Sequence, residues 1–489
     1  MNNCQRKWLS SLLSVVLIVS MMALSACSAI GGNESAGEPE VDISGKFSVG
    51  YGRINITPEE SVPLAGAGNT SQRMSKGVLT YLYTTCRAFT DAKGETALVF
   101  SCDLQNTWTK VFQELRENLS TELSIPIDHI MVACTHTHSA PDLDNYKEPS
   151  IARYFVSLKK WMLKAAKQAL SDRRPAEAGT ASTKAPGLNF VRHYTTESGI
   201  NIGDNFGQDV NSPITGHTHP VDDQMQLIKI TREGGKDIVL VNWQTHPHRT
   251  SDKANGTHYE VSADLVDAMR NKVEKELGCD FIYFTGASGN VNPTSKISEE
   301  NITNNYLEQG QALAQYAIKA LENTQPIELG NIEIASQCYQ GQIDHTEDSK
   351  VAEAREVASN WAAFNDMKQA LALAHQYGIN SPYHAQGIVA KAAMGPTCDI
   401  NLFALKIGKL AFAFAPYEMF DTQGVFIKQN SPFDMTFVCT LANERNSYIP
   451  SEEGYESNCY EANTGYFIKG TGEQLADEFI KLLDSLHTK

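Results

Sequence analysis

The chain has 489 residues, of which 42% are hydrophobic and 20% are charged, and this composition excludes disorder for most of its length. Its formal net charge is −16. Without the first 26 residues, which contain two basic and no acidic side chains, 39 basic and 57 acidic residues remain, a net charge of −18. Such an acidic surface argues against nucleic acid or an anionic membrane surface as a binding partner.

The N-terminus has the pattern of a secretory signal. Arg6 and Lys7 precede an apolar segment over residues 8–23, which is followed by Leu24-Ser25-Ala26-Cys27. A spanning helix would need roughly 20 apolar residues and a stop-transfer flank. The cysteine after Leu-Ser-Ala resembles the lipobox of bacterial lipoproteins, in which the thiol of this cysteine receives a diacylglycerol.

We therefore expect three parts along the chain. A signal peptide over residues 1–26 is followed by a flexible tether, rich in Gly, Ser, Glu and Pro, over residues 27–46, and by a hydrolase domain over residues 47–489. The domain is expected to be exported and anchored to the bacterial membrane through the lipid at Cys27, facing the periplasm or the cell exterior. No oligomeric state follows from the sequence.

From residue 47 onward, buried-strand patterns alternate with amphipathic helical patterns. Strands are predicted at 96–102, 130–134, 238–243, 281–285 and 435–439, with a hairpin formed by 400–405 and 410–415. Helices are predicted at 108–123, 151–170, 263–277, 307–321 and 473–486, and a helical pattern also covers 348–374. The stretch 377–396 is predicted to be irregular and to form a surface excursion rather than a pocket wall. The pattern predicts an α/β (mixed α+β) fold with layered mixed sheets flanked by helices.

Histidines cluster at the ends of predicted strands. His136 and His138 follow the strand at 130–134, and His246 follows the strand at 238–243. Three His-x-His pairs, which also include His217/His219 and His246/His248, hold six of the 13 histidines. On a strand, residues two apart point the same way, so each pair is able to address one ion. A hydrolytic zinc site needs three or four such ligands and a position for water.

The acidic candidate for the same site is Glu418. It follows the fully apolar run 410–415, and a carboxylate buried there is costly unless it is paired. A bound metal ion would satisfy it. The pair His217/His219 is predicted to lie in a loop and is given no role.

Eight cysteines remain besides Cys4 and Cys27, and none forms a Cys-x-x-Cys pair. Several lie in apolar runs, where a free buried thiol is the commoner state, although export permits disulfides. No pairing is assigned.

Together, several segments resemble the catalytic domain of the neutral (non-lysosomal) ceramidase family. They occur in family order from about residue 49 to 466 and are the opening 49–58, the Thr-His-Thr-His-Ser segment 135–139, Asn242-Trp243 with His246, the turn 286–293, Pro416-x-Glu418, Ala442-Asn443 leading to Tyr448, and Tyr460.

The resemblance implies a single zinc ion and metal-assisted hydrolysis of an acyl amide in a small molecule or lipid, with ceramide as one candidate. It implies His136, His246, Glu418 and Tyr448 as zinc ligands. It also implies that His138 activates water or stabilises the oxyanion, that Tyr460 contacts the scissile group, and that Arg192 supplies positive charge.

The sequence departs from the family pattern in three places. The spacing from Asn242 to His246 is one residue shorter, Asn290 stands where the family usually has Asp, and an immunoglobulin-like C-terminal domain is not expected. A zinc deacylase or esterase acting on an acylated sugar or another exported amide therefore remains an alternative, as does a non-enzymatic ligand-binding lipoprotein. A serine hydrolase centred on Ser288 is disfavoured because the final Gly of G-x-S-x-G is missing.

Overall fold

The computed structural model describes residues 42–67, 70, 73–203, 212–253, 256–364, 366–457 and 459–488. Residues 43–489 form one compact unit. The predicted signal peptide and most of the predicted tether lie outside the described residues. Within the described ranges, no helix has the length and apolar character needed to cross a membrane.

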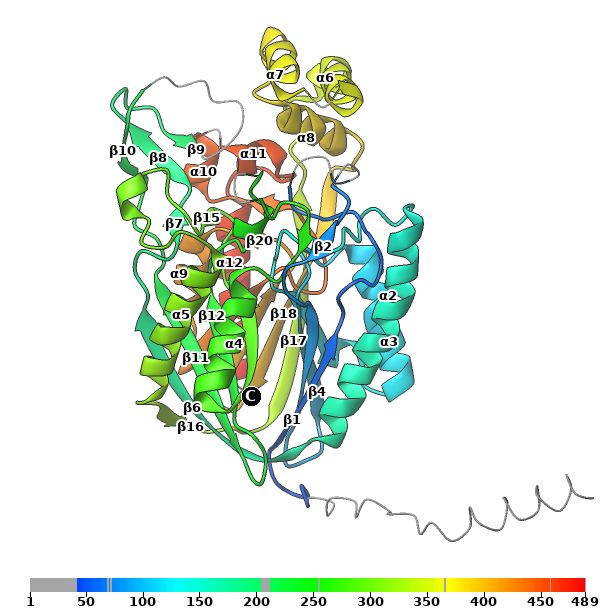
Figure 1. Ribbon diagram of the computed structural model, residues 1–489, viewed down its shortest axis with the longest axis vertical. Helices are drawn as coiled ribbons and strands as arrows, with labels where there is room; N and C mark the ends of the chain where they lie inside the picture. Colours follow the sequence, from blue (N-terminus) through cyan, green and yellow to red (C-terminus); the bar gives the residue numbers. More distant parts are fainter. Residues whose placement is uncertain are drawn as a thin grey trace, which may run out of the picture. The chain divides into compact units, whose positions relative to one another are not determined.

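A large mixed sheet forms the centre of the compact unit (Figure 1). Its strand order is β14-β12-β11-β6-β1-β3-β4-β5, and β16 pairs with β6. The pairs β4–β5 and β12–β14 are parallel and the others are antiparallel. The strands are β1 (Ser48–Asn55), β3 (Tyr83–Thr90), β4 (Thr96–Cys102), β5 (Ile130–Cys134), β6 (Arg174–Lys184), β11 (Gln224–Arg232), β12 (Ile238–Trp243), β14 (Asp280–Thr285) and β16 (Gln325–Ile327).

A second sheet packs face to face on the first. It contains β17 (Ile332–Gln342), β18 (Thr397–Ile407), β19 (Leu410–Ala415) and β21 (Met435–Thr440) in that order. Successive side chains of β19 lie on opposite faces of this sheet. The large residues, such as Phe412, face the large sheet, whereas the intervening alanines face away from it. The apolar layer between the sheets is one of the main cores.

Helices cover both outer faces, which gives four layers (Figure 1). The outer face of the large sheet carries α2 (Thr109–Leu123), α3 (Pro149–Ser171), α4 (Leu265–Leu277) and α5 (Tyr306–Leu321). The outer face of the second sheet carries α9 (Asp421–Asn430) and α12 (Thr471–His487). The predicted α/β fold with layered mixed sheets flanked by helices is confirmed.

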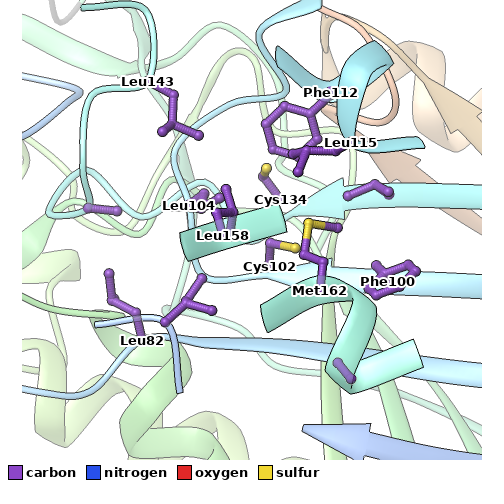
Figure 2. Packing of buried hydrophobic residues seen from close by; sticks show 14 of the residues in the cluster. Leu82, Phe100, Cys102, Leu104, Phe112, Leu115, Cys134, Leu143, Leu158 and Met162 are labelled. Atoms are coloured by element: carbon purple, nitrogen blue, oxygen red, sulfur yellow. The ribbon is translucent and has the colours of Figure 1, made fainter. Parts of the chain in front are cut away.

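The cysteines in the described part of the chain are free thiols. Figure 2 shows Cys102 and Cys134 in the core under α2 and α3, where Phe112, Leu158 and Met162 pack around them. Burial raises the pKa of both thiols, so they behave as small apolar side chains.

Short elements join these layers where β5, β12 and β19 end. They are β2 (Gly77–Val78) with β13 (Glu260–Val261), β7 (Phe190–Val191) with β15 (Val291–Asn292), β8 (His193–Thr196) with β9 (Ile202–Gly203) and β10 (Ile214–His217), β20 (Glu418–Met419) with β22 (Tyr448–Ile449), and the helices α10 (Glu452–Glu456) and α11 (Tyr460–Thr464). Single 3₁₀ turns lie at Ile127–His129, Arg249–Ser251, Ser298–Glu300 and Asp348–Lys350.

A three-helix insert differs from the prediction. The helical pattern at 348–374 forms two helices, α6 (Val351–Phe364) and α7 (Met367–Gln376), and the stretch predicted to be irregular contains α8 (Pro382–Ala392). Ser381 caps α8 by accepting a hydrogen bond from the His384 amide, and Pro382 occupies its first turn. The prediction was wrong because nearby glycines and prolines were taken as loop signals, although Ser-Pro is also a helix start.

Helix α3 packs closely against β1 at Gly52. A Cβ added to Gly52 would lie 2.0 Å from the Ala165 carbonyl oxygen, which is helix backbone and has little freedom to move. We expect Gly52→Ala to lower the free energy of unfolding by about 2–3 kcal/mol. Urea denaturation measures this loss. Gly395→Ala is the control, because its added Cβ meets nothing closer than 4.0 Å. Equal stabilities for the two variants would contradict the packing.

Candidate metal centre

Two histidines and one carboxylate meet where three buried strands end. His136 follows β5, His246 follows β12, and Glu418 begins the short strand β20 just after β19. Oε2 of Glu418 lies 3.5 Å from Nε2 of His136 and 3.3 Å from Nε2 of His246. All three side chains are buried. Residues far apart in the sequence thus bring two nitrogens and an oxygen to one point.

The other ring nitrogen of each histidine faces a backbone carbonyl. Nδ1 of His136 lies 2.7 Å from the Gln105 oxygen, and Nδ1 of His246 lies 2.9 Å from the Val291 oxygen. A carbonyl only accepts hydrogen bonds, so each Nδ1 must carry the proton. The Nε2 lone pairs are then free for a metal, which is the tautomer that metal-ligating histidines adopt.

Two polar atoms at this point are buried and make no hydrogen bond, namely Nε2 of His246 and Oε2 of Glu418. Burial lowers the pKa of His246 to about 3. Burial alone would raise the pKa of Glu418, but His136 and His246 hold it well below its usual value. A neutral imidazole beside an ionised carboxylate is the ligand state that a divalent cation requires. The residues therefore fit a metal ion, and their N/O donor set suits zinc.

His138 lies against the same group. Its Nε2 is 3.2 Å from Nε2 of His136, and ligand atoms of His136, His138 and His246 all lie within 4.8 Å of one another. Burial and the neighbouring histidines lower its pKa well below the usual value. Its backbone carbonyl accepts a hydrogen bond from the buried Arg73 at 2.6 Å, a contact that the sequence did not suggest.

His136 and His138 were predicted to point the same way because they continue a strand, and this reason was wrong. β5 ends at Cys134, and His136 has a left-handed backbone with φ of 65° instead of an extended one. This conformation is unfavourable for a residue with a Cβ and is typical of functional sites. The pair nevertheless converges, because the turn at His136 brings the two rings into an edge contact with centroids 4.7 Å apart.

Tyr448 is the strand partner of Glu418, since β20 and β22 pair in parallel with these two residues in register. Three residues of the preceding loop, Leu441, Asn443 and Ser447, also have left-handed backbones. Asn443 fixes the loop to β5 by exchanging hydrogen bonds of 2.8 and 2.9 Å with the backbone of Val132. The strand that leads to His136 therefore also positions Tyr448.

Arg192 and Tyr460 complete the arrangement. The Arg192 guanidinium lies 5.6 Å from the centre of the Tyr448 ring, and the Tyr448 and Tyr460 rings are 5.7 Å apart. Arg192 is only 8% exposed, so it is no surface arginine. The structure thus brings all seven predicted site residues together, while their roles stay predictions.

The remaining pair, His217 and His219, lies outside this group. His217 ends β10 and contacts the Val191 carbonyl and Glu300, the latter at 2.7 Å. His219 follows in the turn and lies 3.1 Å from Asp421. Asp421 also accepts a hydrogen bond of 2.8 Å from Asn290. Both histidines are thus engaged by acids or backbone of neighbouring elements, and the prediction of a loop was wrong for His217, which ends β10.

The backbone of the turn at 286–293 is in close contact with the backbone of β20. A Cβ on Gly289 would lie 2.6 Å from the Glu418 carbonyl oxygen, and the Gly289 amide donates to the Met419 oxygen at 2.7 Å. Glycine is needed here because only its bare backbone allows this approach. The turn therefore fixes the position of Glu418 and leaves Ser288 as part of the packing.

The helical insert also reaches the site, which the prediction of a surface excursion missed. Tyr383 of α8 packs edge to face against Tyr460, with ring centroids 5.6 Å apart, and against Trp361 of α6 at 4.5 Å. An aromatic row therefore runs from Tyr448 through Tyr460 and Tyr383 into the insert.

We expect Tyr383→Ala to raise KM for substrate about tenfold with a small change in kcat. An aromatic contact of this kind is worth about 0.5–1.5 kcal/mol, and its loss frees the Tyr460 ring. Steady-state kinetics of Tyr383→Ala and Tyr383→Phe measure the effect. Phe364→Ala, at the exposed end of α6, serves as the control. An unchanged KM in Tyr383→Ala would show that the insert takes no part in substrate binding.

The sequence matches no protein-family model, and no curated protein matches it significantly. Solved structures do match. The chain is similar to the neutral ceramidase from Pseudomonas aeruginosa, with a TM-score of 0.65 and 16% identity over 90% of this chain and 74% of that one. It is similar to a ceramidase complexed with C2, with a TM-score of 0.66 and 16% identity over 91% and 75%. The fold is therefore that of the neutral ceramidases.

Proposed function

We propose that this protein is a zinc-dependent hydrolase that cleaves an N-acyl amide bond, with N-acyl sphingoid lipids such as ceramide as its substrate class. The observation that carries the proposal is the convergence of His136, His246 and Glu418, whose facing atoms are buried and, for His246 and Glu418, without hydrogen-bond partners. The ceramidase-like fold and the ordered motifs support the choice of substrate class.

Four side chains are assigned to the metal. His136, His246 and Glu418 would hold zinc through Nε2, Nε2 and Oε2, and Tyr448 would contribute its phenol from the adjacent strand. When bound, zinc polarises the amide carbonyl and activates a water molecule for attack. His138, whose ring is half-buried, is assigned outside the ligand set because the family resemblance gives this histidine a role in activating water.

The remaining residues supply protons and charge. His138, which is neutral because burial lowers its pKa, accepts a proton during attack. Arg192, held beside Tyr448, is assigned as an N–H donor to the carbonyl oxygen on which negative charge develops. The proton taken up by His138 then passes to the departing amine. Burial raises the pKa of Tyr460, so its phenol keeps its proton and donates a hydrogen bond at the scissile group.

The test uses the full chain, purified in detergent and loaded with zinc. We expect it to release fatty acid and sphingoid base from N-acylsphingosines of several chain lengths, as measured by mass spectrometry. Acetylated sugars and a nitrophenyl ester are tested in parallel. Hydrolysis confined to the acetylated sugars would show that the protein is a deacylase of acylated sugars and not a ceramidase. No hydrolysis of any substrate would overturn the proposal.

We further propose that the body is exported and held to the bacterial membrane through lipidated Cys27. The support is the sequence order of Arg6 and Lys7, the apolar segment and the Leu-Ser-Ala-Cys junction. Labelling with a fatty-acid analogue in the native host tests this, with Cys27→Ala as the comparison. Label on both forms, or on neither, would contradict the anchor.

A further inference from the structure

The guanidinium of Arg192 is held on every nitrogen. Its Nε donates to Oε1 of Glu461 at 2.5 Å, Nη2 donates to the Gly289 carbonyl at 2.8 Å, and Nη1 lies 3.4 Å from Oδ1 of Asn292. Arg192 is 8% exposed and Glu461 is fully buried. Charge-assisted contacts of this kind restrict a guanidinium to one orientation. Here that orientation places it beside Tyr448.

The second oxygen of Glu461 is also occupied, because Oε2 lies 3.1 Å from Nε2 of His193. His193, Cys459 and Glu461 are close enough to resemble a second metal cluster. The carboxylate is, however, already paired with a guanidinium, so the group is an ion-pair network. Burial alone would raise the pKa of Glu461, but Arg192 and His193 lower it, and the side chain stays ionised.

The charge of Arg192 acts on the candidate ligands. Its guanidinium lies 5.6 Å from the centre of the Tyr448 ring, and Tyr448 is the strand partner of Glu418. An unbalanced positive charge at this place would oppose the binding of a divalent cation, since charges are poorly screened in a buried site. The negative charge of Glu461 provides the balance.

We propose that Glu461 is a positioning residue that fixes the Arg192 guanidinium beside Tyr448 and cancels its charge, so that a divalent cation binds at His136, His246 and Glu418. The inference rests on the proposed function, because it requires that this site binds zinc. Tyr460 and Glu461 are adjacent in the chain. The short helix α11 delivers a substrate-facing phenol and the anchor of Arg192 in one turn.

The test measures zinc affinity by competition with a chelator, using the full chain in detergent. We expect Glu461→Gln to bind zinc about 10- to 100-fold more weakly, the range typical for the outer partners of metal ligands. Glu461→Asp is expected to lie between Glu461→Gln and the wild type. In the double variant Arg192→Met/Glu461→Gln the unbalanced charge is gone, so zinc affinity returns to within about threefold of the wild type.

The double variant separates charge balance from damage to the fold, since a second substitution does not repair a disrupted core. Asp172→Asn is the matched control, because it removes an ion pair with buried Arg232 at the other end of the large sheet and is expected to leave zinc affinity unchanged. Thermal unfolding checks that every variant is folded. Wild-type affinity in Glu461→Gln, or an equally weak double variant, would overturn the inference.

A wrong proposed function is distinguishable from a wrong role for Glu461, because in the first case the wild type itself would bind no zinc. A crystal structure of Glu461→Gln then still decides the positioning role. We expect the Arg192 guanidinium to have moved away from Tyr448, and an unmoved guanidinium would contradict that role.

Discussion

The His246→Ala variant is expected to lose its zinc and at least about a thousandfold in amide hydrolysis. His246 is fully buried, its Nδ1 is fixed by the Val291 carbonyl, and its Nε2 has no hydrogen-bond partner. A metal ion contributes several kcal/mol to transition-state stabilisation, and about 1.4 kcal/mol corresponds to a tenfold change in rate. Metal analysis and kcat/KM on an N-acylsphingosine measure both losses.

The matched control for this variant is His129→Ala. His129 precedes β5, at the end of that strand opposite to His136, and its ring contacts the Thr96 carbonyl and Glu95. Its removal is expected to leave zinc content and kcat/KM at wild-type values. If His246→Ala retained one zinc per chain, His246 would not be a ligand and the assignment of the centre would be wrong.

Glu418→Gln is expected to abolish the stabilisation of the fold by zinc. A ligand that binds only the folded state stabilises it by about 4 kcal/mol at a free concentration of about 1,000 times its Kd. The neutral amide of glutamine is a poor zinc ligand and supplies no negative charge beside His136 and His246. We expect zinc to raise the free energy of unfolding of the variant by less than about 1 kcal/mol.

Denaturant titration with and without zinc measures this difference. Glu333→Gln is the control, because Glu333 pairs with Lys406 on the second sheet and lies on no element of the site. It should respond to zinc as the wild type does. An unchanged response of Glu418→Gln to zinc would show that the metal binds elsewhere.

The strands β5, β12 and β19 were predictable because they consist mainly of apolar residues. β5 and β19 are continuous apolar runs, β12 is apolar except for Asn242, and each is covered on both faces by the other sheet, by helices or by both. By contrast, β6 lies between β11 and β1 in the large sheet but was not predicted. Its sequence is rich in Ala, Thr and charged residues and it is mostly half-buried, so no apolar run marks it.

The sequence predicted the site residues that follow an apolar strand or belong to a family motif. It did not predict a residue that only a contact between distant segments brings to the site. His136, His246 and Glu418 follow apolar runs, and the resemblance supplied Tyr448, Arg192 and Tyr460. Glu461 has no signal in the sequence, because its partner Arg192 lies 269 residues away. Only the fold shows that this acidic residue is buried and paired with an arginine of the site.

Zinc titration of the metal-free full chain, followed by hydrolysis of an N-acylsphingosine, tests the central claim most directly. Activity is predicted to be absent without metal, to rise in proportion to added zinc, and to reach its maximum at one zinc per chain. Hydrolysis by the metal-free protein at the full rate, or no hydrolysis at any zinc content, would contradict the claim.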